Sequence, residues 1–347
     1  MKLRKIIILA ILAITIDSYG QSSKNQTVQT VEELGLTTFI VDDFSDRYFG
    51  KVLLTENETS GDVVEGSGWI VIFDKETNRQ LIKVENDQIF IWLHKGKVRA
   101  NIAELPYGEQ SIIMYSDFNF DDKADFAIMN GRYSCYGGPS FEIYLATDKG
   151  FEYSEDFTHL AQDYCGMFHL DYDEKQISTM TKSGCCWHQY STFVVEDNRP
   201  VAIKIVEEGL NMAGVWDIVE QKRVNGKMIT QEYSVLNTNE KMDVIYSFEF
   251  SNKKKMKLLA HYDRLLYIFT NKDDKIELYI WDEVFHYSKK DNMLEFENEG
   301  TTYKIISSGI IVNTANKKYD MKALSETIKG SLTDILEKNF ENVMVIQ

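Results

Sequence analysis

The amino-acid sequence predicts an all-β protein whose strands form a sandwich, a barrel or a propeller-like antiparallel array. Short apolar runs recur at short intervals along the 347 residues, and turn-forming residues separate them. Aromatic residues, which favour strands, make up 12% of the chain. Only 3 prolines occur, which excludes long proline-rich linkers.

Composition places the chain among ordinary globular proteins. Hydrophobic residues make up 44% and charged residues 27%, so the chain is too apolar for a disordered protein. The formal net charge is -16. Such a surface repels nucleic acid and anionic lipid, so neither is an expected partner. It suits solubility, cation binding or a basic protein partner.

Residues 1–20 have the pattern of a secretory signal peptide. A basic start at residues 1–5 precedes an apolar run at 6–16, which is too short to span a bilayer comfortably. Small residues at Ser18 and Gly20 then mark a cleavage site. A permanent N-terminal anchor is the alternative. Cleavage removes three basic residues and one acidic residue, which changes the net charge from -16 to -18.

The mature chain is therefore expected to be secreted or periplasmic, with no membrane span. Residues 21–30 are polar, which predicts a flexible leader. A first β domain is expected over 31–225 and a second, with lysine-rich turns, over 226–347. Strands of the first domain are predicted at 36–41, 69–73, 80–84, 89–93, 111–115, 126–129, 141–145, 168–170, 176–181, 191–195 and 201–206.

The C-terminal β domain is expected to end in one helix. Ser331 is the predicted N-cap, with Asp334 three residues further on. The apolar residues that would share one helical face are Leu332, Ile335, Leu336 and Phe340. Strands of this domain are predicted at 244–250, 265–269, 276–281, 293–296, 303–306 and 310–312.

An acidic loop at residues 117–125 carries the strongest chemical pattern. Calcium takes six to eight oxygen ligands, and a coiling loop supplies them from alternate residues. The pattern places Asp117, Asn119 and Asp121 at loop positions 1, 3 and 5. The backbone carbonyl of Lys123 follows at position 7, and Asp125 closes the site at position 9. We therefore predict a Ca²⁺ site; a solvated acidic turn without metal is the alternative.

Two positions of this loop depart from a helix–loop–helix calcium site. Asp122 stands where glycine usually makes the sharp turn, although aspartate tolerates a left-handed conformation better than most residues. Ile128 stands where a bidentate glutamate is required. A loop between two strands fits better, and its expected role is structural, because a divalent cation relieves the repulsion among its carboxylates.

Three stretches together resemble a known family. They are Asp-Phe-Asn-Phe-Asp-Asp-Lys-Ala-Asp-Phe-Ala-Ile at 117–128, Tyr-Gly-Gly-Pro-Ser-Phe-Glu-Ile-Tyr-Leu at 136–145, and Ser-Gly-Cys-Cys-Trp-His at 183–188. The chain resembles exported β-proteins of Gram-negative bacteria that serve as periplasmic immunity proteins, and its acidic loop is similar to the FG-GAP-type calcium loops of β-propellers. The resemblance implies a propeller-like fold and an inhibitor of cell-wall lytic enzymes.

The four cysteines form an even set, and in an oxidising compartment two disulfides are expected. The segment after Cys165 is expected to form a hairpin with the segment before Cys185. That hairpin favours pairing Cys165 with Cys185 or Cys186, and Cys135 with the remaining cysteine. A vicinal Cys185–Cys186 bridge is the alternative. A zinc site with His188 is disfavoured, because the cysteine pairs lack metal-ligand spacing.

Aromatic residues beside these cysteines are candidate partner contacts. They are Tyr133, Tyr136, Trp187 and Tyr190, which stand among glycines and serines in predicted loops. The alternative is that they pack around the disulfides.

No hydrolase triad motif, phosphate loop, dinucleotide fingerprint or zinc-protease motif occurs. The sequence therefore favours a non-enzymatic, calcium-stabilised binding protein, with a basic cell-wall hydrolase as the expected partner. A secreted polysaccharide or cell-wall hydrolase with an unidentified carboxylate pair is the alternative.

Overall fold

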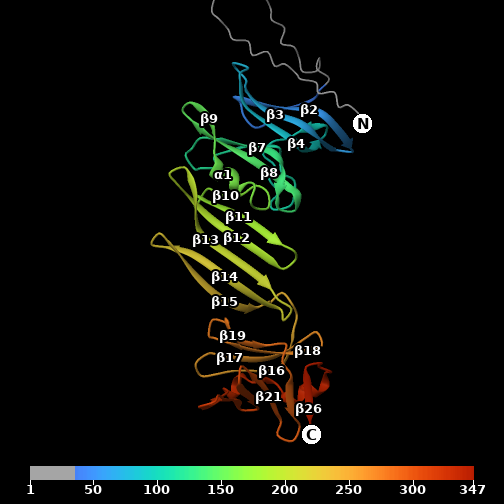
Figure 1. Ribbon diagram of the computed structural model, residues 1–347, viewed down its shortest axis with the longest axis vertical. Coiled ribbons are helices and arrows are strands. Elements are labelled where there is room, and N and C mark those ends of the chain that lie inside the picture. The colour runs from blue at the N-terminus through green and yellow to red at the C-terminus, as the bar shows by residue number, and fades with distance from the viewer. Residues whose placement is uncertain (1–35) are drawn as a thin grey trace, which may run out of the picture.

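A computed structural model describes residues 36–347. These residues form four β-sheets that follow one another along a long molecule, with a few short helices between them (Figure 1). The predicted all-β class is therefore confirmed. The predicted signal peptide (1–20) and leader (21–30) lie outside the described residues. Within 36–347, no helix combines the length and apolarity needed to cross a membrane.

The first sheet is a five-stranded antiparallel meander. A turn at 74–78 joins two of its strands, and the Asp74 carboxylate stabilises it by accepting hydrogen bonds from the backbone N–H and the hydroxyl of Thr77, both at 2.9 Å. The strands predicted at 80–84 and 89–93 are one continuous strand. The five strands are β1 (Thr37–Val41), β2 (Tyr48–Ser60), β3 (Val63–Asp74), β4 (Gln80–His94) and β5 (Lys97–Val98).

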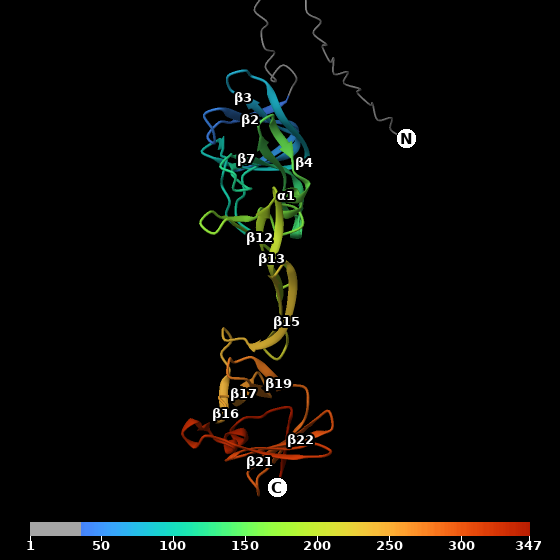
Figure 2. The same cartoon turned by 90° about the vertical axis from the view of Figure 1, so that its left-hand side faces the viewer.

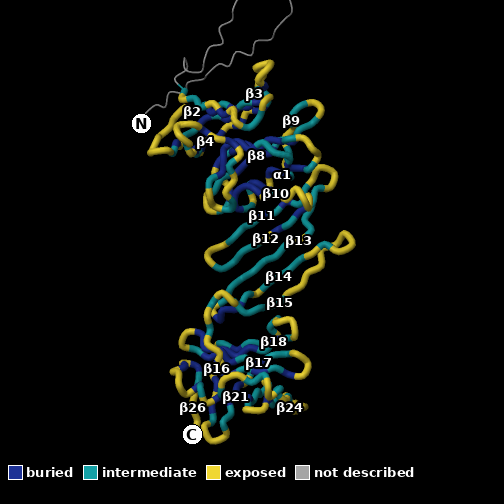
Figure 3. The backbone as a smooth tube through the Cα atoms, turned by 180° about the vertical axis from the view of Figure 1, so that it is seen from behind, coloured by how far each residue is buried: buried dark blue, intermediate teal, exposed yellow. Residues whose placement is uncertain are grey.

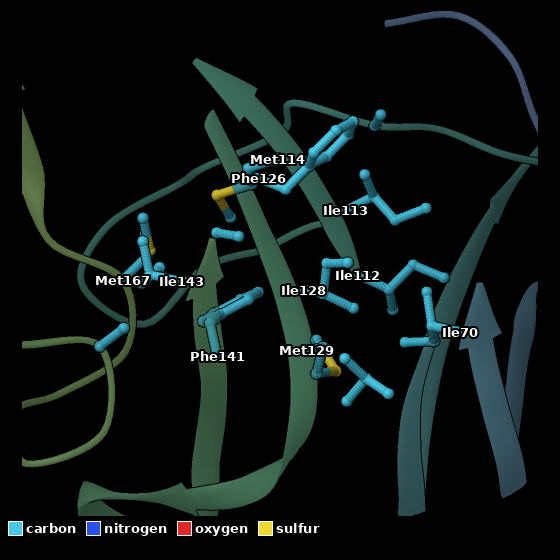
Figure 4. Close-up of a cluster of buried hydrophobic side chains, with 14 of the residues drawn as sticks. Ile70, Ile112, Ile113, Met114, Phe126, Ile128, Met129, Phe141, Ile143 and Met167 are labelled. Carbon is cyan, nitrogen blue, oxygen red and sulfur yellow. The ribbon is translucent and has the colours of Figure 1, made fainter. Parts of the chain in front are cut away.

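The second sheet packs against the first around a shared core. Phe126 and Ile128, on one face of a central strand, are fully buried on the side of Ile70 of the first sheet, whereas Phe141 of the neighbouring strand is buried on the opposite face (Figure 4). A short helix, α1 (Glu155–Leu160), adds Phe157 to this core. The strands are β6 (Ile113–Ser116), β7 (Asp125–Ser134), β8 (Gly138–Thr147) and β9 (Gly150–Tyr153).

The third sheet runs through the middle of the molecule and has eleven strands. Its central strands form a single layer, since no residue of β13 (Arg199–Leu210) or β15 (Lys227–Leu236) is buried (Figures 2 and 3). Its strands, in spatial order, are β10 (His169–Asp171), β11 (Gln176–Ser183), β12 (Trp187–Glu196), β13 (Arg199–Leu210), β14 (Val215–Val224), β15 (Lys227–Leu236), β19 (Ile276–Ile280), β18 (Arg264–Thr270), β17 (Lys255–His261), β16 (Asp243–Glu249) and β25 (Lys329–Gly330).

The fourth sheet closes a separate C-terminal core with the far end of the third. Tyr267, Phe285 and Phe296 are among the fully buried side chains of this core. Its last two strands run parallel. The strands, in spatial order, are β24 (Lys318–Lys322), β23 (Gly309–Asn313), β22 (Thr301–Ile306), β21 (Met293–Asn298), β20 (Phe285–Ser288) and β26 (Val343–Ile346).

The predicted domain boundary at 225/226 falls in the turn between the paired strands β14 and β15, and the division into two domains stays a prediction. The propeller-like arrangement of the strands likewise stays a prediction.

The predicted terminal helix is shorter and tighter than expected. Ser331 is its N-cap, and Ser331 and Asp334 complete the expected capping box. The element is, however, the 3₁₀ helix η4 (Leu332–Glu337), a short 3₁₀ turn like η2 (Cys135–Gly137) and η3 (Ser325–Thr327). With three residues per turn, Leu332 and Ile335 share the buried face, whereas Leu336 points to solvent.

This difference gives a matched pair of variants. We expect Ile335→Ala to lower the free energy of unfolding by about 2–5 kcal/mol, because it empties a buried site. Leu336→Ala should cost well under about 1 kcal/mol, because that side chain is exposed. Urea unfolding of the two variants measures both values. Equal losses would contradict the difference in burial between the two side chains.

Candidate calcium loop and aromatic surface

The acidic loop joins two antiparallel strands, as expected. β6 ends at Ser116 and β7 begins at Asp125, and these two residues pair with each other. The residue at loop position 12, Ile128, is completely buried within β7. The loop is therefore of the strand–loop–strand type rather than helix–loop–helix.

Side-chain oxygens of the loop turn inward onto its own backbone. The Asp117 carboxylate accepts hydrogen bonds from the backbone N–H groups of Asp121 (3.1 Å) and Asp122 (2.8 Å). Asn119 Oδ1 also accepts from the Asp121 N–H at 3.3 Å, and Asp121 Oδ1 accepts from the Lys123 N–H at 2.9 Å. The three residues at positions 1, 3 and 5 therefore direct oxygens to the inside of one coil.

The sharp turn at loop position 6 is made by aspartate instead of glycine. Asp122 has φ 67°, the left-handed conformation expected for it from the sequence. Phe120 also adopts a left-handed φ of 62°. The coil therefore forms without glycine, at a backbone cost that aspartate tolerates better than most residues.

Asp125 anchors the loop from beneath. Its side chain is 0% exposed, and its two oxygens accept hydrogen bonds from the backbone N–H groups of Phe118 and Ala146, each at 2.7 Å. Ala146 lies near the end of β8, so this carboxylate joins the loop to the strand next to β7. Burial raises the pKa of Asp125 to about 7; the charges of Asp117 and Asp121 act in the same direction, and the two N–H donors oppose it.

The donor chemistry of the loop fits calcium, which binds hard oxygen ligands. The inward oxygens come from Asp117, Asn119 and Asp121, whereas the Lys123 amine points away to Asp148 at 3.0 Å. Within residues 36–347, no three side chains of His, Cys, Asp or Glu converge as a metal cage. Both oxygens of Asp125 are already bonded to backbone N–H groups. Calcium binding therefore stays a prediction.

The disulfide pairing differs from the preferred prediction. All four cysteines are oxidised, in the pairs Cys135–Cys165 and Cys185–Cys186. The expected bridge from Cys165 to Cys185 or Cys186 is therefore wrong, and the vicinal alternative is the one that forms.

The reason is that the predicted hairpin stops pairing before it reaches Cys165. β10 and β11 pair only as far as His169 with Ser178. The chain then turns at Gly166, and the Cys165 N–H donates to the carbonyl of Met180 at 2.8 Å. Cys165 therefore lies well short of the hairpin tip that holds Cys185.

Two local contacts complete this arrangement. The Cys135 N–H donates to the Tyr164 carbonyl at 3.3 Å, which brings Cys135 beside Cys165. β11 and β12 pair up to Ser183 with Trp187, so the vicinal cysteines form the tip of that hairpin.

The four predicted contact aromatics do not lie on one face. Tyr133, Tyr136 and Tyr190 are between 45% and 66% exposed. Trp187 is half-buried, and strand alternation places it on the face of β12 opposite Tyr190. Tyr136 lies against the hairpin tip, where its hydroxyl accepts a hydrogen bond from the Gly184 N–H at 2.6 Å.

Other aromatic residues, which sequence reasoning missed, join Tyr136 at a cavity of about 350 Å³. Trp92 and Tyr107 are 45% and 54% exposed and line it. Lys182 holds the group together, since its Nζ lies 4.6 Å from the ring centre of Tyr107 and 5.4 Å from that of Tyr136. Inward and outward side chains alternate along β4, so the buried position of Ile89 could have placed the side chain of Trp92 on the outer face. No pattern in the sequence marks Tyr107 as a residue of this cavity.

An acidic groove of about 500 Å³ adjoins this aromatic cavity. Phe90 and Arg132 line both, and the guanidinium carbon of Arg132 lies 5.4 Å from the centre of the Phe90 ring. The carboxylates that line the groove are Glu56, Glu58, Glu65 and Asp87.

No protein-family model matches the chain, and no curated protein matches it. It is distantly similar in structure to a type IV secretion system related protein of Xanthomonas, with 17% identity, 58% of this chain and 95% of that chain covered, and a TM-score of 0.46. It is also distantly similar to a periplasmic gluconolactonase of Pseudomonas aeruginosa, with 10% identity, 84% and 87% covered, and a TM-score of 0.19. A putative 6-phosphogluconolactonase of Bacteroides uniformis gives 10% identity, the same coverage and a TM-score of 0.20. TM-scores below 0.5 do not establish a common fold.

The two disulfides predict which tryptic peptides stay linked when the protein is digested without a reducing agent. Cleavage after Arg132, Lys149, Lys175 and Lys182 separates the cysteines onto three peptides. We expect the peptide of Cys135 to be linked to that of Cys165, and the peptide of Cys185 and Cys186 to run alone, lighter by two hydrogens than its reduced form. Mass spectrometry measures this. A single species joining all three peptides would contradict the vicinal pair.

The buried carboxylate predicts a pH dependence in metal-free protein. The pKa of Asp125 is raised from 3.8 to about 7 in the folded state, so between these values only the folded protein holds the proton. Stability from this group is therefore fully present below about pH 4 and lost as pH rises through about 7.

Urea unfolding in chelator tests this against Asp125→Asn, which cannot titrate. We expect the stability of the wild type, measured relative to the variant, to fall across that window. A difference that stays constant with pH would contradict the raised pKa.

Proposed function

We propose that this chain is an exported, calcium-stabilised, non-enzymatic binding protein that inhibits a basic cell-wall lytic enzyme. The observation that carries the proposal is the aromatic cavity beside the acidic groove. Protein interfaces favour exposed aromatic and arginine anchors in concave sites, and acidic groups around them select a basic partner.

The aromatic cavity is held in place before any partner binds. The Cys135–Cys165 disulfide lines it, the hydroxyl of Tyr136 is bonded to the hairpin tip, and Lys182 lies over two of its rings. A rigid surface loses less conformational entropy on binding, and tyrosine offers a large contact area with few rotatable bonds. This arrangement therefore supports a role as a docking surface.

The charge of the chain supports the same kind of partner. A net charge of -16 attracts basic proteins from a distance and raises the rate of encounter. Four carboxylates line the groove beside the aromatic cavity, with Arg132 between the two. A basic loop of an enzyme would meet the carboxylates, while an apolar side chain enters the aromatic cavity.

The disulfides support the proposed export of the chain, and the acidic loop supports the proposed calcium site. Two disulfides are typical of proteins in oxidising compartments, which supports a secreted or periplasmic location. In the proposed site, the side-chain oxygens of Asp117, Asn119 and Asp121 and the carbonyl of Lys123 hold Ca²⁺. Asp125 completes the site from beneath when it is ionised. The ion would neutralise charges that repel each other in its absence.

A hydrolase of cell-wall polysaccharide is the second candidate. The acidic groove favours it, because glycoside hydrolysis uses two carboxylates. The aromatic cavity offers only one among its lining residues, Glu109, which is bonded to His94 at 2.7 Å. The groove is therefore where a catalytic pair would have to lie.

Lysis assays on peptidoglycan suspensions test both candidates, with a basic c-type lysozyme and other basic lytic enzymes as probes. We expect the chain to inhibit at least one enzyme of this panel and to release no product alone. Tyr107→Ala should weaken inhibition about 30-fold or more, the loss typical of a hot-spot residue. Tyr319→Ala, which removes a similarly exposed tyrosine from β24, should change little.

Two outcomes would contradict the inhibitor proposal. One is that excess chain leaves every enzyme of the panel at full rate. The other is that the chain releases sugars by itself and loses this activity in Glu65→Gln or Asp87→Asn, which would establish the hydrolase.

A further inference from the structure

Four cations surround one cavity of this acidic protein. The cavity has a volume of about 390 Å³ and lies where the turns of the two N-terminal sheets meet. Arg47, Arg79, Lys123 and Lys149 line it, and Asp148 is the one carboxylate among its lining residues. Since the whole chain carries a net charge of -16, this is a local reversal of the prevailing charge.

The cations come from four separate segments. Arg47 precedes β2, and Arg79 lies in the turn between β3 and β4. Lys123 belongs to the acidic loop, and Lys149 lies in the turn between β8 and β9. Tertiary folding, rather than a basic run in the sequence, therefore brings them to one place.

Their charges are only partly neutralised by the protein. Among residues 36–347, neither Arg79 nor Lys149 has an acidic partner within ion-pair distance. Arg47 uses Nε to bind Asp74 at 3.3 Å, and its side chain stays 73% exposed. Lys123 pairs with Asp148 at 3.0 Å, but that carboxylate is 95% exposed and therefore bound weakly.

The cavity also has an apolar wall. The half-buried rings of Tyr115 and Phe151 line it, with the buried ring of Tyr48 beside them. Arg47 stacks on this wall, with its guanidinium carbon 5.2 Å from the centre of the Tyr48 ring. A ligand in the cavity would thus meet cations on its polar side and aromatic carbon on the other.

We propose that this cavity binds a phosphate group, either free or carried on a sugar ring that packs against the aromatic wall. A phosphate dianion offers three oxygens and two charges, which match several cations better than a single carboxylate does. The planar arginine forks bind two of its oxygens in parallel, and the lysines act as point charges. This site is separate from the aromatic cavity and does not depend on the inhibitor proposal.

Asp148 is the group that opposes the ligand. Its carboxylate would repel a phosphate, and it competes for the Lys123 amine. Because it is almost fully exposed, it can turn into solvent when the anion enters. Asp148→Asn should therefore strengthen phosphate binding.

Isothermal titration of the full chain at low ionic strength tests the proposal, with inorganic phosphate, glucose 1-phosphate and uncharged glucose as probes. We expect saturable binding of at least one phosphate compound and none of glucose. The double variant Arg79→Gln, Lys149→Gln should bind at least about tenfold more weakly, because each lost charged hydrogen bond costs about that factor. Both side chains are exposed in turns, so the fold should survive.

The matched control removes the same charge elsewhere. Lys227→Gln, Lys272→Gln changes two exposed lysines elsewhere, one at the start of β15 and one in the turn before β19, and should leave affinity within about twofold. Tighter binding of glucose 1-phosphate than of inorganic phosphate would assign the site to sugar-borne phosphate, and equal affinities would assign it to the free anion. Absence of saturable binding, or equal losses in the two double variants, would overturn the proposal.

Discussion

The buried carboxylate of Asp125 is the interaction on which the candidate site depends. It lies beneath the acidic loop, where its two oxygens accept the N–H groups of Phe118 and Ala146 and so fix the loop to β8. The same burial makes its negative charge costly, and Asp117 and Asp121 add repulsion from above. The loop can lower this cost in two ways: a proton on Asp125, which its raised pKa favours, or a divalent cation among the three carboxylates.

The hydrogen bonds of Asp125 are one of several links between the loop and the rest of the N-terminal half. The loop closes the sheet β6–β9, whose core is shared with the first sheet, and Asn119 also donates to Asn198 at 3.2 Å in the turn between β12 and β13. Lys123 extends from the loop into the cationic cavity. The third sheet is a single layer around β13 and β15, whereas its far strands β17 and β18 contribute Leu259, Leu266 and Ile268 to a buried cluster. The Cys135–Cys165 disulfide and the hydrogen bond of Tyr136 to the hairpin tip hold the aromatic cavity in place.

The sequence predicted the elements whose signal is local. Short apolar runs between turn residues predicted most strands, and Ser331 predicted the N-cap of the C-terminal helix. The aspartates predicted a strand–loop–strand coil with Asp122 left-handed. It failed where long-range geometry decides. β14 and β15 escaped notice because neighbouring residues such as Ile218 and Val219 are both half-buried, so neither face shows the usual alternation. The cysteine pairs depended on where a hairpin stops, and the cationic cavity depended on four separated turns.

Differential scanning calorimetry with chelator and with Ca²⁺ added back tests the central claim, that a cation relieves the strain around Asp125. At a calcium concentration about 100 times its dissociation constant, the ion should add about 2.7 kcal/mol and raise the melting temperature by roughly 5 °C or more. The variant Asp117→Asn, Asp121→Asn should lose this shift. A melting temperature that chelator leaves unchanged, or an equal shift in the variant, would contradict the account.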